Sequence, residues 1–380
     1  MKYFSLLVVF IAISSKVYLQ KSCVLEGKVG NYPIVMWIDE ATDKSNSQQK
    51  TSATYFYKSN RHDIELEGVW KTNDILILTN TDEYDSTIYE QFILKYISPN
   101  NWSGTWKNKK GKLQAIVFQP IDTLKYTFNE VPELDNLKAE ERIYTKTRLS
   151  FVKLTKDSTT QFGKYVLDWY TDEISKISLF RIKSGYDSST IKKLNYILAK
   201  SQFNNIECFF NCNSNKGEGQ WDYNIYDYFI NKNIISIAAS ISSYCGGPYP
   251  SVGDDNLTID AVTGKEIKDL DDIFWFTKQK PLKEEDKNYY DYTEKRGNII
   301  FNILTKLYPN EMKKPKGEDC DYSRPDPWQY PSWYFKPEGL FIGASFPHVL
   351  QACANPEFAI IPYKLLLPYI VKGKEYLLQH

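Results

Sequence analysis

The sequence predicts an α+β fold class, in which an N-terminal antiparallel β-meander, open or closed into a barrel-like shape, precedes a mixed α+β domain. In the first third of the chain, short runs that alternate apolar and polar residues recur every ~8–12 residues, with turn residues between them. Farther along, strand-like runs mix irregularly with segments of helical apolar spacing. We therefore expect a signal peptide at 1–22, the meander at 23–122, a linker at 123–142 and the α+β domain at 143–380.

The first residues predict secretion. Lys2 is followed by an apolar run from Tyr3 to Ile13, which is too short to span a bilayer and is typical of a signal peptide. Cleavage is expected after Ser14 or nearer Ser22. Cys23 offers an alternative, a lipid anchor on the first mature residue, although large polar residues precede it. No later segment holds 18 consecutive apolar residues, so we expect an exported, periplasmic or extracellular protein without a membrane span.

The strands of the meander follow the period-2 alternation, which gives each strand one face toward the core and one toward water. Turn signals such as Asn108-Lys109-Lys110-Gly111 separate them. The predicted strands are 34–38, 54–57, 64–68, 75–78, 89–94, 101–106 and 113–118.

The second domain is predicted to begin with a strand from Tyr144 to Leu154. Ser188 or Ser189 can cap a helix whose apolar residues repeat at helical spacing as far as Leu198, and the segment from Asn204 to Gly219 has the composition of a loop. The later elements are strands at 165–170, 223–230, 234–243 and 257–260, a helix at 284–307, a hairpin of 333–335 with 340–343, a strand at 359–363 and a helix at 364–370.

The composition excludes some classes of function. Lys and Arg total 47, as do Asp and Glu, so the net charge is zero, whereas a general nucleic-acid binder normally has a basic surplus. The 29 Tyr and 9 Trp suit strand-rich domains and surfaces that stack on sugars or proteins.

Six cysteines are expected to form disulfides after export to an oxidising compartment. Cys320 and Cys353 flank the last predicted hairpin and are the expected long-range pair. Cys208 and Cys212 are four residues apart and could close a local bridge, which would leave the other two cysteines paired or not. A zinc site is the competing interpretation, but one CxxxC spacing and three His support it poorly, so we predict neither a metal nor another cofactor.

A set of motifs in the second domain resembles a known family. They are Tyr244-Cys245-Gly246-Gly247-Pro248-Tyr249-Pro250, Thr263-Gly264-Lys265-Glu266, Leu270-Asp271-Asp272-Ile273-Phe274, Pro337-Glu338-Gly339-Leu340 and Ile361-Pro362-Tyr363. Together they look like the bacterial envelope domain of unknown function found at the C-terminus of the RsiV-type lysozyme-sensing anti-sigma factor and, as an accessory domain, in a peptidoglycan deacetylase. An exported β-rich module often precedes such domains. The resemblance covers residues 144–370, but the family's usual His after Gly-Gly is absent here.

The resemblance implies a non-catalytic, extracytoplasmic domain that binds a partner. In the anti-sigma factor the domain binds lysozyme, a cationic glycan hydrolase, although we know of no motif in this chain that encodes lysozyme binding. Tyr244, Gly246, Gly247 and Tyr249 are therefore the candidate residues for the surface that the domain presents.

No catalytic motif is present in the sequence, neither GxSxG nor HExxH, a P-loop or GxGxxG after a strand. The adjacent pairs Asp254-Asp255 and Asp271-Asp272 suit turn and helix-cap roles better than a glycosidase pair, whose carboxyl groups must converge. Asp319, Asp321 and Asp326 lack the Gly and Glu positions of a calcium-binding EF-hand loop. We therefore predict no catalytic residue and no metal site.

Aromatic residues gather near the C-terminus and form a candidate binding surface, because flat rings supply contact area at low entropic cost, although packing inside a hairpin explains many of them. His348 is a candidate to line a groove, whereas His62 is expected in a solvated turn. The aromatic cluster consists of Trp328, Tyr330, Trp333, Tyr334 and Phe335, of which Trp328 and Trp333 are the binding candidates.

Two classes of function follow, with a purely structural envelope protein as a third. The first is an exported binding protein of the bacterial cell envelope, whose partner is a secreted hydrolase such as lysozyme or an envelope glycan. The second is a carboxylate-dependent enzyme that acts on peptidoglycan or another glycan. In either class the partner is a protein or glycan of the envelope and not a nucleic acid.

Overall fold

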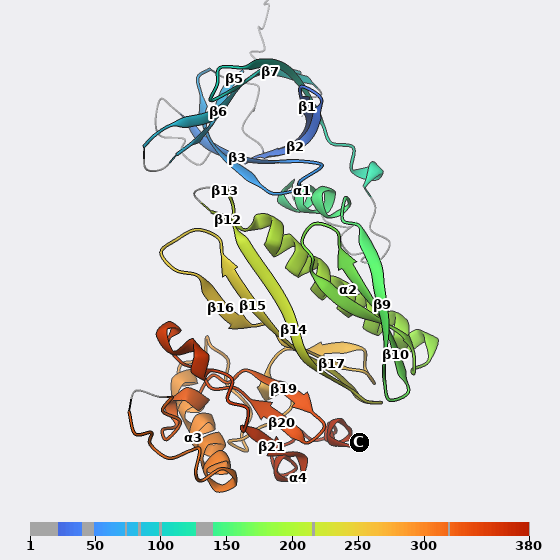
Figure 1. The fold of residues 1–380 in the computed structure, drawn as a ribbon, viewed down its shortest axis with the longest axis vertical. Coiled ribbons are helices and arrows are strands. Elements are labelled where there is room, and N and C mark those ends of the chain that lie inside the picture. Colours follow the sequence, from blue (N-terminus) through green and yellow to red (C-terminus); the bar gives the residue numbers. More distant parts are fainter. Residues whose placement is uncertain are drawn as a thin grey trace, which may run out of the picture. The chain divides into compact units, whose positions relative to one another are not determined.

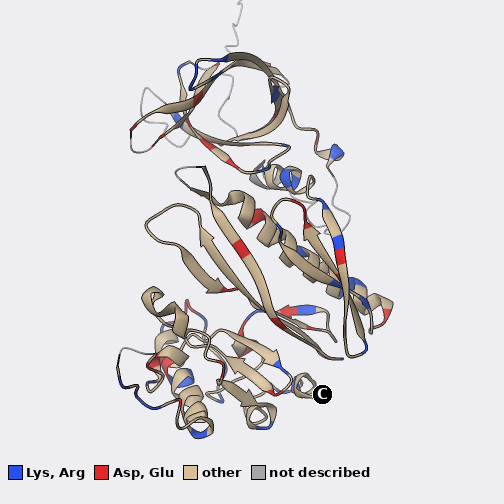
Figure 2. Cartoon of the chain, viewed as in Figure 1, with Lys and Arg blue, Asp and Glu red and all other residues tan. Residues whose placement is uncertain are grey.

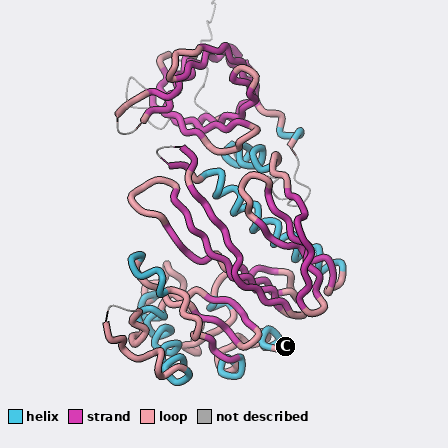
Figure 3. Tube along the Cα trace, in the orientation of Figure 1, coloured by secondary structure: helices cyan, strands magenta, loops and turns pink. Residues whose placement is uncertain are grey.

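The computed structural model describes residues 22–39, 49–72, 74–82, 85–98, 101–126, 140–214, 217–317 and 320–379. The predicted signal peptide lies outside these residues apart from Ser22, as does most of the predicted linker. The chain is β-rich with few helices (Figures 1 and 3) and divides into two compact units. Unit 1 comprises Met1–Tyr126 with Leu137–Arg148, and unit 2 comprises Thr127–Asn136 with Leu149–His380.

Unit 1 contains a closed antiparallel barrel of eight strands, which Figure 1 shows as a ring. Each strand pairs with the next, and β1 pairs with β8, so the barrel has no open sheet edge. The predicted meander is confirmed, and its closure depends on β1, a strand that the alternation pattern did not indicate. The strands are β1 (Cys23–Val29), β2 (Tyr32–Ile38), β3 (Gln49–Tyr57), β4 (Ile64–Trp70), β5 (Ile75–Thr81), β6 (Ile88–Ser98), β7 (Asn101–Asn108) and β8 (Leu113–Pro120).

Side chains from alternate positions fill the barrel interior, as expected for eight strands. Gly27 is needed where β1 approaches β8, because a Cβ at this position would lie 2.5 Å from the ring of Phe118. The buried interior residues include Leu25, Ile34, Met36, Tyr55, Leu66, Leu76, Leu78, Phe92, Leu94, Trp102, Ile116 and Phe118.

Helix α1 (Glu140–Leu149) replaces the strand predicted from Tyr144 to Leu154. Tyr144 and Arg148 are four residues apart, so a helix places both on one face, where both bind Asp63. The ring of Tyr144 also packs edge-on against Phe56, with centroids 5.2 Å apart. These contacts stabilise the helix over the weak strand preference of its sequence, and they make α1 part of unit 1.

Unit 2 contains three larger sheets and three α-helices among its described residues. A short hairpin of β12 (Asn213–Ser214) and β13 (Gly217–Glu218) follows the first helix. The first sheet contains β9 (Leu154–Phe162), β10 (Tyr165–Asp172) and β11 (Ser178–Ser184). The second sheet contains β14 (Gln220–Ile230), β15 (Ile234–Tyr244), β16 (Ser251–Asp254), β17 (Leu257–Asp260) and β18 (Lys265–Ile267), and the third contains β19 (Trp333–Lys336), β20 (Gly339–Ile342) and β21 (Ile360–Pro362). The helices are α2 (Ser188–Asn211), α3 (Tyr289–Leu307) and α4 (Tyr363–Leu366).

Helix α2 extends through much of the segment predicted as a loop from Asn204 to Gly219. Ile206 and Phe210 continue its buried face at helical spacing, which the surrounding Asn and Cys residues obscure in the sequence. Its N-cap is Asp187, whose carboxylate accepts hydrogen bonds from the backbone of Ser189 and Thr190, rather than the predicted Ser188 or Ser189.

Strand β15 is the central strand of unit 2 and is buried on both faces over its first half. Ile235 and Ile237 face the core shared with α2 and the first sheet. Ile234 belongs to the core on the other side, and Ala238 packs there against Tyr334 of β19. Burial on both faces explains why this stretch is a continuous apolar run instead of an alternating one.

Ser236 joins the second sheet to the third through a buried hydroxyl. Its Oγ accepts a hydrogen bond from the backbone nitrogen of Phe335 at 3.0 Å and lies 2.9 Å from the hydroxyl of Thr258. We expect Ser236→Ala to lower the free energy of unfolding by about 1–3 kcal/mol, because it leaves a buried donor without a partner. Urea unfolding measures this change. Ser251→Ala, at an exposed position, is the control and should shift stability by no more than about 0.5 kcal/mol; equal effects of the two substitutions would contradict the role of Ser236.

Candidate functional site

One face of the β14–β16 sheet is uncovered along the first half of β14, the second half of β15 and β16. Residues directly opposite each other on paired strands share a face. Asp222 is opposite Ser242, which is opposite Val252 on its other side. Asn224, Ser240 and Asp254 form the next row. Figure 1 shows these strands continuing beyond the third sheet. We call this surface the open face; its residues are Asp222, Asn224, Tyr226, Ser240, Ser242, Tyr244, Val252 and Asp254.

The third sheet covers the neighbouring part of the same face and marks where the open face begins. Tyr226 meets Tyr334 edge-on, with ring centroids 6.1 Å apart, and Lys336 pairs with Asp227 at 3.2 Å. Burial, followed by the negative charges of Asp254 and Asp227, raises the pKa of Tyr226, so its phenol stays protonated. The open face therefore carries hydrogen-bonding groups and aromatic rings but only one aliphatic side chain, that of Val252.

Two loops extend the open face with exposed apolar side chains. The β15–β16 loop carries Tyr249, which is 74% exposed, and the 3₁₀ helix η5 (His348–Cys353) carries Val349, which is 87% exposed. His348 joins them, because its Nε2 lies 2.7 Å from the carbonyl oxygen of Pro250 and its ring is 6.5 Å from that of Tyr249. We call Tyr249, Pro250 and His348–Leu350 the loop tip.

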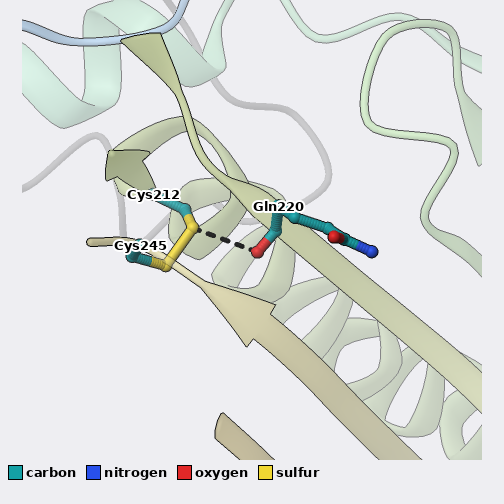
Figure 4. Close-up of a disulfide and its surroundings, with 3 residues drawn as sticks. All are labelled: Cys212, Gln220 and Cys245. Carbon is teal, nitrogen blue, oxygen red and sulfur yellow. Dashed lines mark hydrogen bonds between the residues drawn. A yellow bond between two sulfur atoms is a disulfide. The ribbon is translucent and has the colours of Figure 1, made fainter. Parts of the chain in front are cut away.

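Each of the two disulfides ties one of the loops that carry this surface to another part of unit 2. Cys212–Cys245 ties the end of β15, where the first loop begins, to the end of α2. Figure 4 shows this bond beside β14, where the Sγ of Cys212 lies 3.2 Å from the carbonyl oxygen of Gln220. Cys320–Cys353 anchors the end of η5. The surface is thus held by covalent bonds at both loops, which lowers the entropic cost of ordering it on binding.

The disulfide pattern matches one expectation and corrects another. Cys320 is bonded to Cys353, as expected. Cys212 is bonded to Cys245 and not to Cys208, because Cys208 lies on the exposed face of α2 while Cys212 is buried at its C-cap, next to β15. Two disulfides are consistent with an exported protein. No helix in the described part of the chain combines the length and the apolar character needed to cross a membrane.

The charge of the open face is negative. Between residues 217 and 255, Lys232 is the only Lys or Arg, and it lies in the β14–β15 turn. Two of its carboxylates accept hydrogen bonds from neutral amides: Asp222 from Gln220 at 2.6 Å and Asp254 from Asn355 at 2.8 Å. Figure 2 shows Asp but no Lys or Arg along this part of β14–β16. The face therefore favours a cationic partner.

The structure separates the residues that the sequence proposed together. Tyr244, Gly246, Gly247, Tyr249 and His348 all belong to the open face or its loops. Tyr244 donates a hydrogen bond to the carbonyl oxygen of Gly247 at 3.0 Å, and both glycines have positive φ, 91° and 90°, which turns the chain after Cys245.

The two tryptophans are not part of this surface. Trp328 is 0% exposed within the core of unit 2, which corrects its predicted binding role. Trp333 is partly buried against the same core, and Tyr330 is 43% exposed. Tyr334 and Phe335 are also buried. The cluster reflects the bulk needed where α3 and the third sheet meet.

The carboxyl groups do not converge in either of the adjacent pairs, Asp254-Asp255 and Asp271-Asp272. Asp254 and Asp255 bind amides on different elements, Asn355 and Asn205. Asp271 lies 2.5 Å from Nη1 of Arg296 and accepts from Tyr292, while Asp272 closes the capping box of the 3₁₀ helix η3 (Leu270–Asp272). Among the described residues, no group of three His, Cys, Asp or Glu is placed to hold a metal ion. Asp319 and His380 lie outside the described residues.

The sequence did not predict the exposed residues Asp222, Asn224 and Tyr226 of β14, nor Val252 and Val349. The alternation of exposed residues along β14 was a usable signal, but only strand pairing and the disulfides bring these residues beside the loop tip. In comparisons with known proteins, no family model and no curated protein matches this chain.

Proposed function

We propose that this chain is an exported, non-catalytic binding protein of the bacterial cell envelope, whose open face and loop tip bind a cationic secreted hydrolase of the lysozyme type. The observation that carries the proposal is the combination of exposed Tyr249 and Val349 on disulfide-anchored loops with the carboxylates of Asp222 and Asp254. The resemblance of residues 144–370 to the α+β domain of the lysozyme-sensing anti-sigma factor supports the same assignment.

The physical argument rests on rigidity and charge. Aromatic and aliphatic side chains that are exposed yet held in place contribute strongly to protein–protein binding, since little conformational entropy is lost. The negative field of these carboxylates steers a cationic protein toward the face and speeds association. A bacterial envelope protein with this surface would capture a hydrolase before it reached the cell wall.

The first test is calorimetric titration of the full chain with lysozyme. We expect a Kd at or below about 10 µM, and weaker binding as the ionic strength rises from about 0.05 M to about 0.5 M. Tyr249→Ala combined with Val349→Ser should weaken binding by about tenfold or more. Tyr290→Ala is the matched control, since Tyr290 is 76% exposed on α3 and lies off the open face.

Charge variants and a second ligand distinguish binding of lysozyme from binding of an envelope glycan. Asp222→Asn with Asp254→Asn should slow association and reduce its salt dependence while leaving the fold intact. Absence of lysozyme binding at about 100 µM would overturn the proposed partner. Binding of soluble peptidoglycan fragments in its place, with loss on Tyr249→Ala, would assign the surface to an envelope glycan.

A further inference from the structure

The barrel of unit 1 has a cavity at one end, which no part of the proposed function uses. Its volume is about 550 Å³, within the range of small-molecule sites. Deeper in the barrel the interior is closed by packed rings, among them Trp102 with Trp70 and Tyr96 at centroid distances of 6.1 and 5.3 Å. We call this space the mouth cavity; its lining residues are Val29, Gly30, Asn31, Tyr32, Tyr57, Trp106, Lys112 and Gln114.

Aromatic rings form much of the cavity wall. Tyr32 and Tyr57 meet at right angles, with centroids 6.2 Å apart and an interplanar angle of 87°. Tyr55 supports Tyr57 from within the barrel, edge-on at 5.5 Å. Rings that face a common space from different directions present their negative faces to an enclosed group, which is the arrangement that binds ammonium ions.

A buried carboxylate lies directly behind this wall. Glu90, on β6, points into the barrel at the same parity as Phe92, and only 9% of it is exposed. It accepts hydrogen bonds from the hydroxyl of Tyr55 at 2.7 Å and from Nε1 of Trp106 at 2.6 Å. Both donors are neutral, and within the described residues no Lys or Arg forms an ion pair with it.

This carboxylate is costly for the barrel as it stands. Burial raises the pKa of Glu90, and the hydrogen bonds from Trp106 and Tyr55 offset that effect only in part. A buried charge without a compensating cation is unfavourable, so an apolar side chain at this position would stabilise the barrel better unless a ligand supplies the positive charge. Trp106 links the two features, because it lines the mouth cavity and also donates to Glu90.

The opposite charge is present at the rim. Lys112 lines the mouth cavity together with the amides of Asn31 and Gln114. These groups disfavour an acyl chain, which would leave them without hydrogen bonds, while Glu90 disfavours a simple anion. A ligand that carries both charges satisfies Glu90 and Lys112 at once.

We propose that the mouth cavity binds a small zwitterion, with its ammonium group against the rings of Tyr32, Tyr57 and Trp106 and its anionic group directed to Lys112. Glu90 supplies the negative field that holds the ammonium group. Lys112 and Gln114 select ligands that end in a carboxylate or a similar anion. This site lies wholly within unit 1, so a test of zwitterion binding is independent of the binding proposed for the open face of unit 2.

Glycine betaine is a suitable probe, because it combines a quaternary ammonium with a carboxylate. Its carbon isostere, 3,3-dimethylbutanoate, in which a carbon atom replaces the quaternary nitrogen, has the same shape but lacks the positive charge. We expect glycine betaine to change the tryptophan fluorescence of the full chain saturably with a Kd below about 1 mM, and the isostere to bind at least about tenfold more weakly. Equal binding of the two, or no binding of glycine betaine at about 10 mM, would overturn the proposal.

Substitutions divide the contributions of the two charges. Glu90→Gln should weaken glycine betaine by about tenfold or more, with Glu67→Gln on the outer barrel face as its control. Gln keeps both hydrogen bonds, since its oxygen accepts from Trp106 and its amide can donate to Tyr55. Lys112→Gln should weaken glycine betaine but not choline, which lacks the carboxylate, and Lys110→Gln in the adjacent turn is its control. If Lys112→Gln weakens both ligands equally, the assigned orientation is wrong.

The pH dependence gives a second readout. Tyr55 and Tyr57 are the titratable groups that face Glu90, and burial raises the pKa of each above its ordinary value of 10, so both stay protonated. Because the pKa of Glu90 is raised above 4.5, the ligand should bind more tightly as the pH rises from 4.5 and the carboxylate ionises. Glu90→Gln should remove this dependence, and a dependence that persists in the variant would contradict the role of Glu90.

Discussion

Replacing Asp63 with alanine is expected to lower the free energy of unfolding of unit 1 by about 3–5 kcal/mol. The substitution removes the partner of Arg148, whose Nη1 lies 2.6 Å from Oδ2 of Asp63 and whose side chain is 1% exposed. Tyr144 also loses its acceptor, since its hydroxyl donates to Oδ1 of Asp63 at 2.6 Å. A buried guanidinium and a buried phenol would then lack this carboxylate, which costs much more than the ion pair contributes.

The direction of the Asp63 pKa supports this asymmetry. Burial raises the pKa of Asp63, and the opposing effects of Arg148 and Tyr144 do not fully compensate for it. The pair is therefore not strongly stabilising as a unit, whereas breaking it is strongly destabilising. Asp63→Ala combined with Arg148→Met should recover much of the loss, because neither charge of this pair then remains buried.

Amide hydrogen exchange of the barrel strands under increasing urea measures this effect separately from unit 2. Asp122→Ala is the control, since Asp122 pairs with Lys125 at 3.9 Å on the surface and should change stability by no more than about 1 kcal/mol. A loss for Asp63→Ala as small as that of the control would show that α1 is not held by this pair.

Removing the Cys212–Cys245 bond, through Cys212→Ser with Cys245→Ser, is expected to destabilise unit 2 by about 3–4 kcal/mol. The bond joins residues separated by 33 positions, and the unfolded chain regains the corresponding conformational freedom once the bond is lost. The change also releases the end of β15, so lysozyme binding at the open face should weaken beyond the effect on stability alone.

The second disulfide is a close internal comparison, because Cys320–Cys353 has the same separation of 33 positions. Chain entropy alone then predicts the same loss for Cys320→Ser with Cys353→Ser, and any difference reports local packing. Cys208→Ser is the control, as Cys208 belongs to neither bond, and should change stability by no more than about 0.5 kcal/mol. Urea midpoints that do not change on reduction would contradict both expectations.

Local patterns predicted many elements because they carry their own periodicity. The barrel strands from Ile34 to Phe118 alternate apolar and polar residues, and the hairpin of β14 and β15 is bounded by a clear Asn-Lys-Asn turn. Patterns failed where a tertiary contact outweighed a local preference. Tyr144 and Arg148 form a helix because both bind Asp63, which is 81 positions from Tyr144.

The candidate surface shows the same division. The motif from Tyr244 to Pro250 was visible in the sequence, and the structure places it at the end of the open face. Its neighbours were not visible, since His348 lies 98 positions from Pro250 and Asn355 lies 101 from Asp254. Conversely, the aromatic cluster looked like a surface, yet Trp328 is buried, because composition alone does not distinguish a core ring from an exposed one.

The sequence by itself determined the strands of the meander, the apolar run of β15 and the Gly-Gly turn, since these depend on spacing and local chemistry; for Cys320 and Cys353 it gave an expected pair, which the structure confirms. Only the tertiary structure decided that β1 closes the barrel, that Cys212 pairs with Cys245, and that Glu90 lies buried behind the mouth cavity. Each of these depends on which residues distant in sequence meet, and that is set by the burial of whole faces rather than by any local pattern.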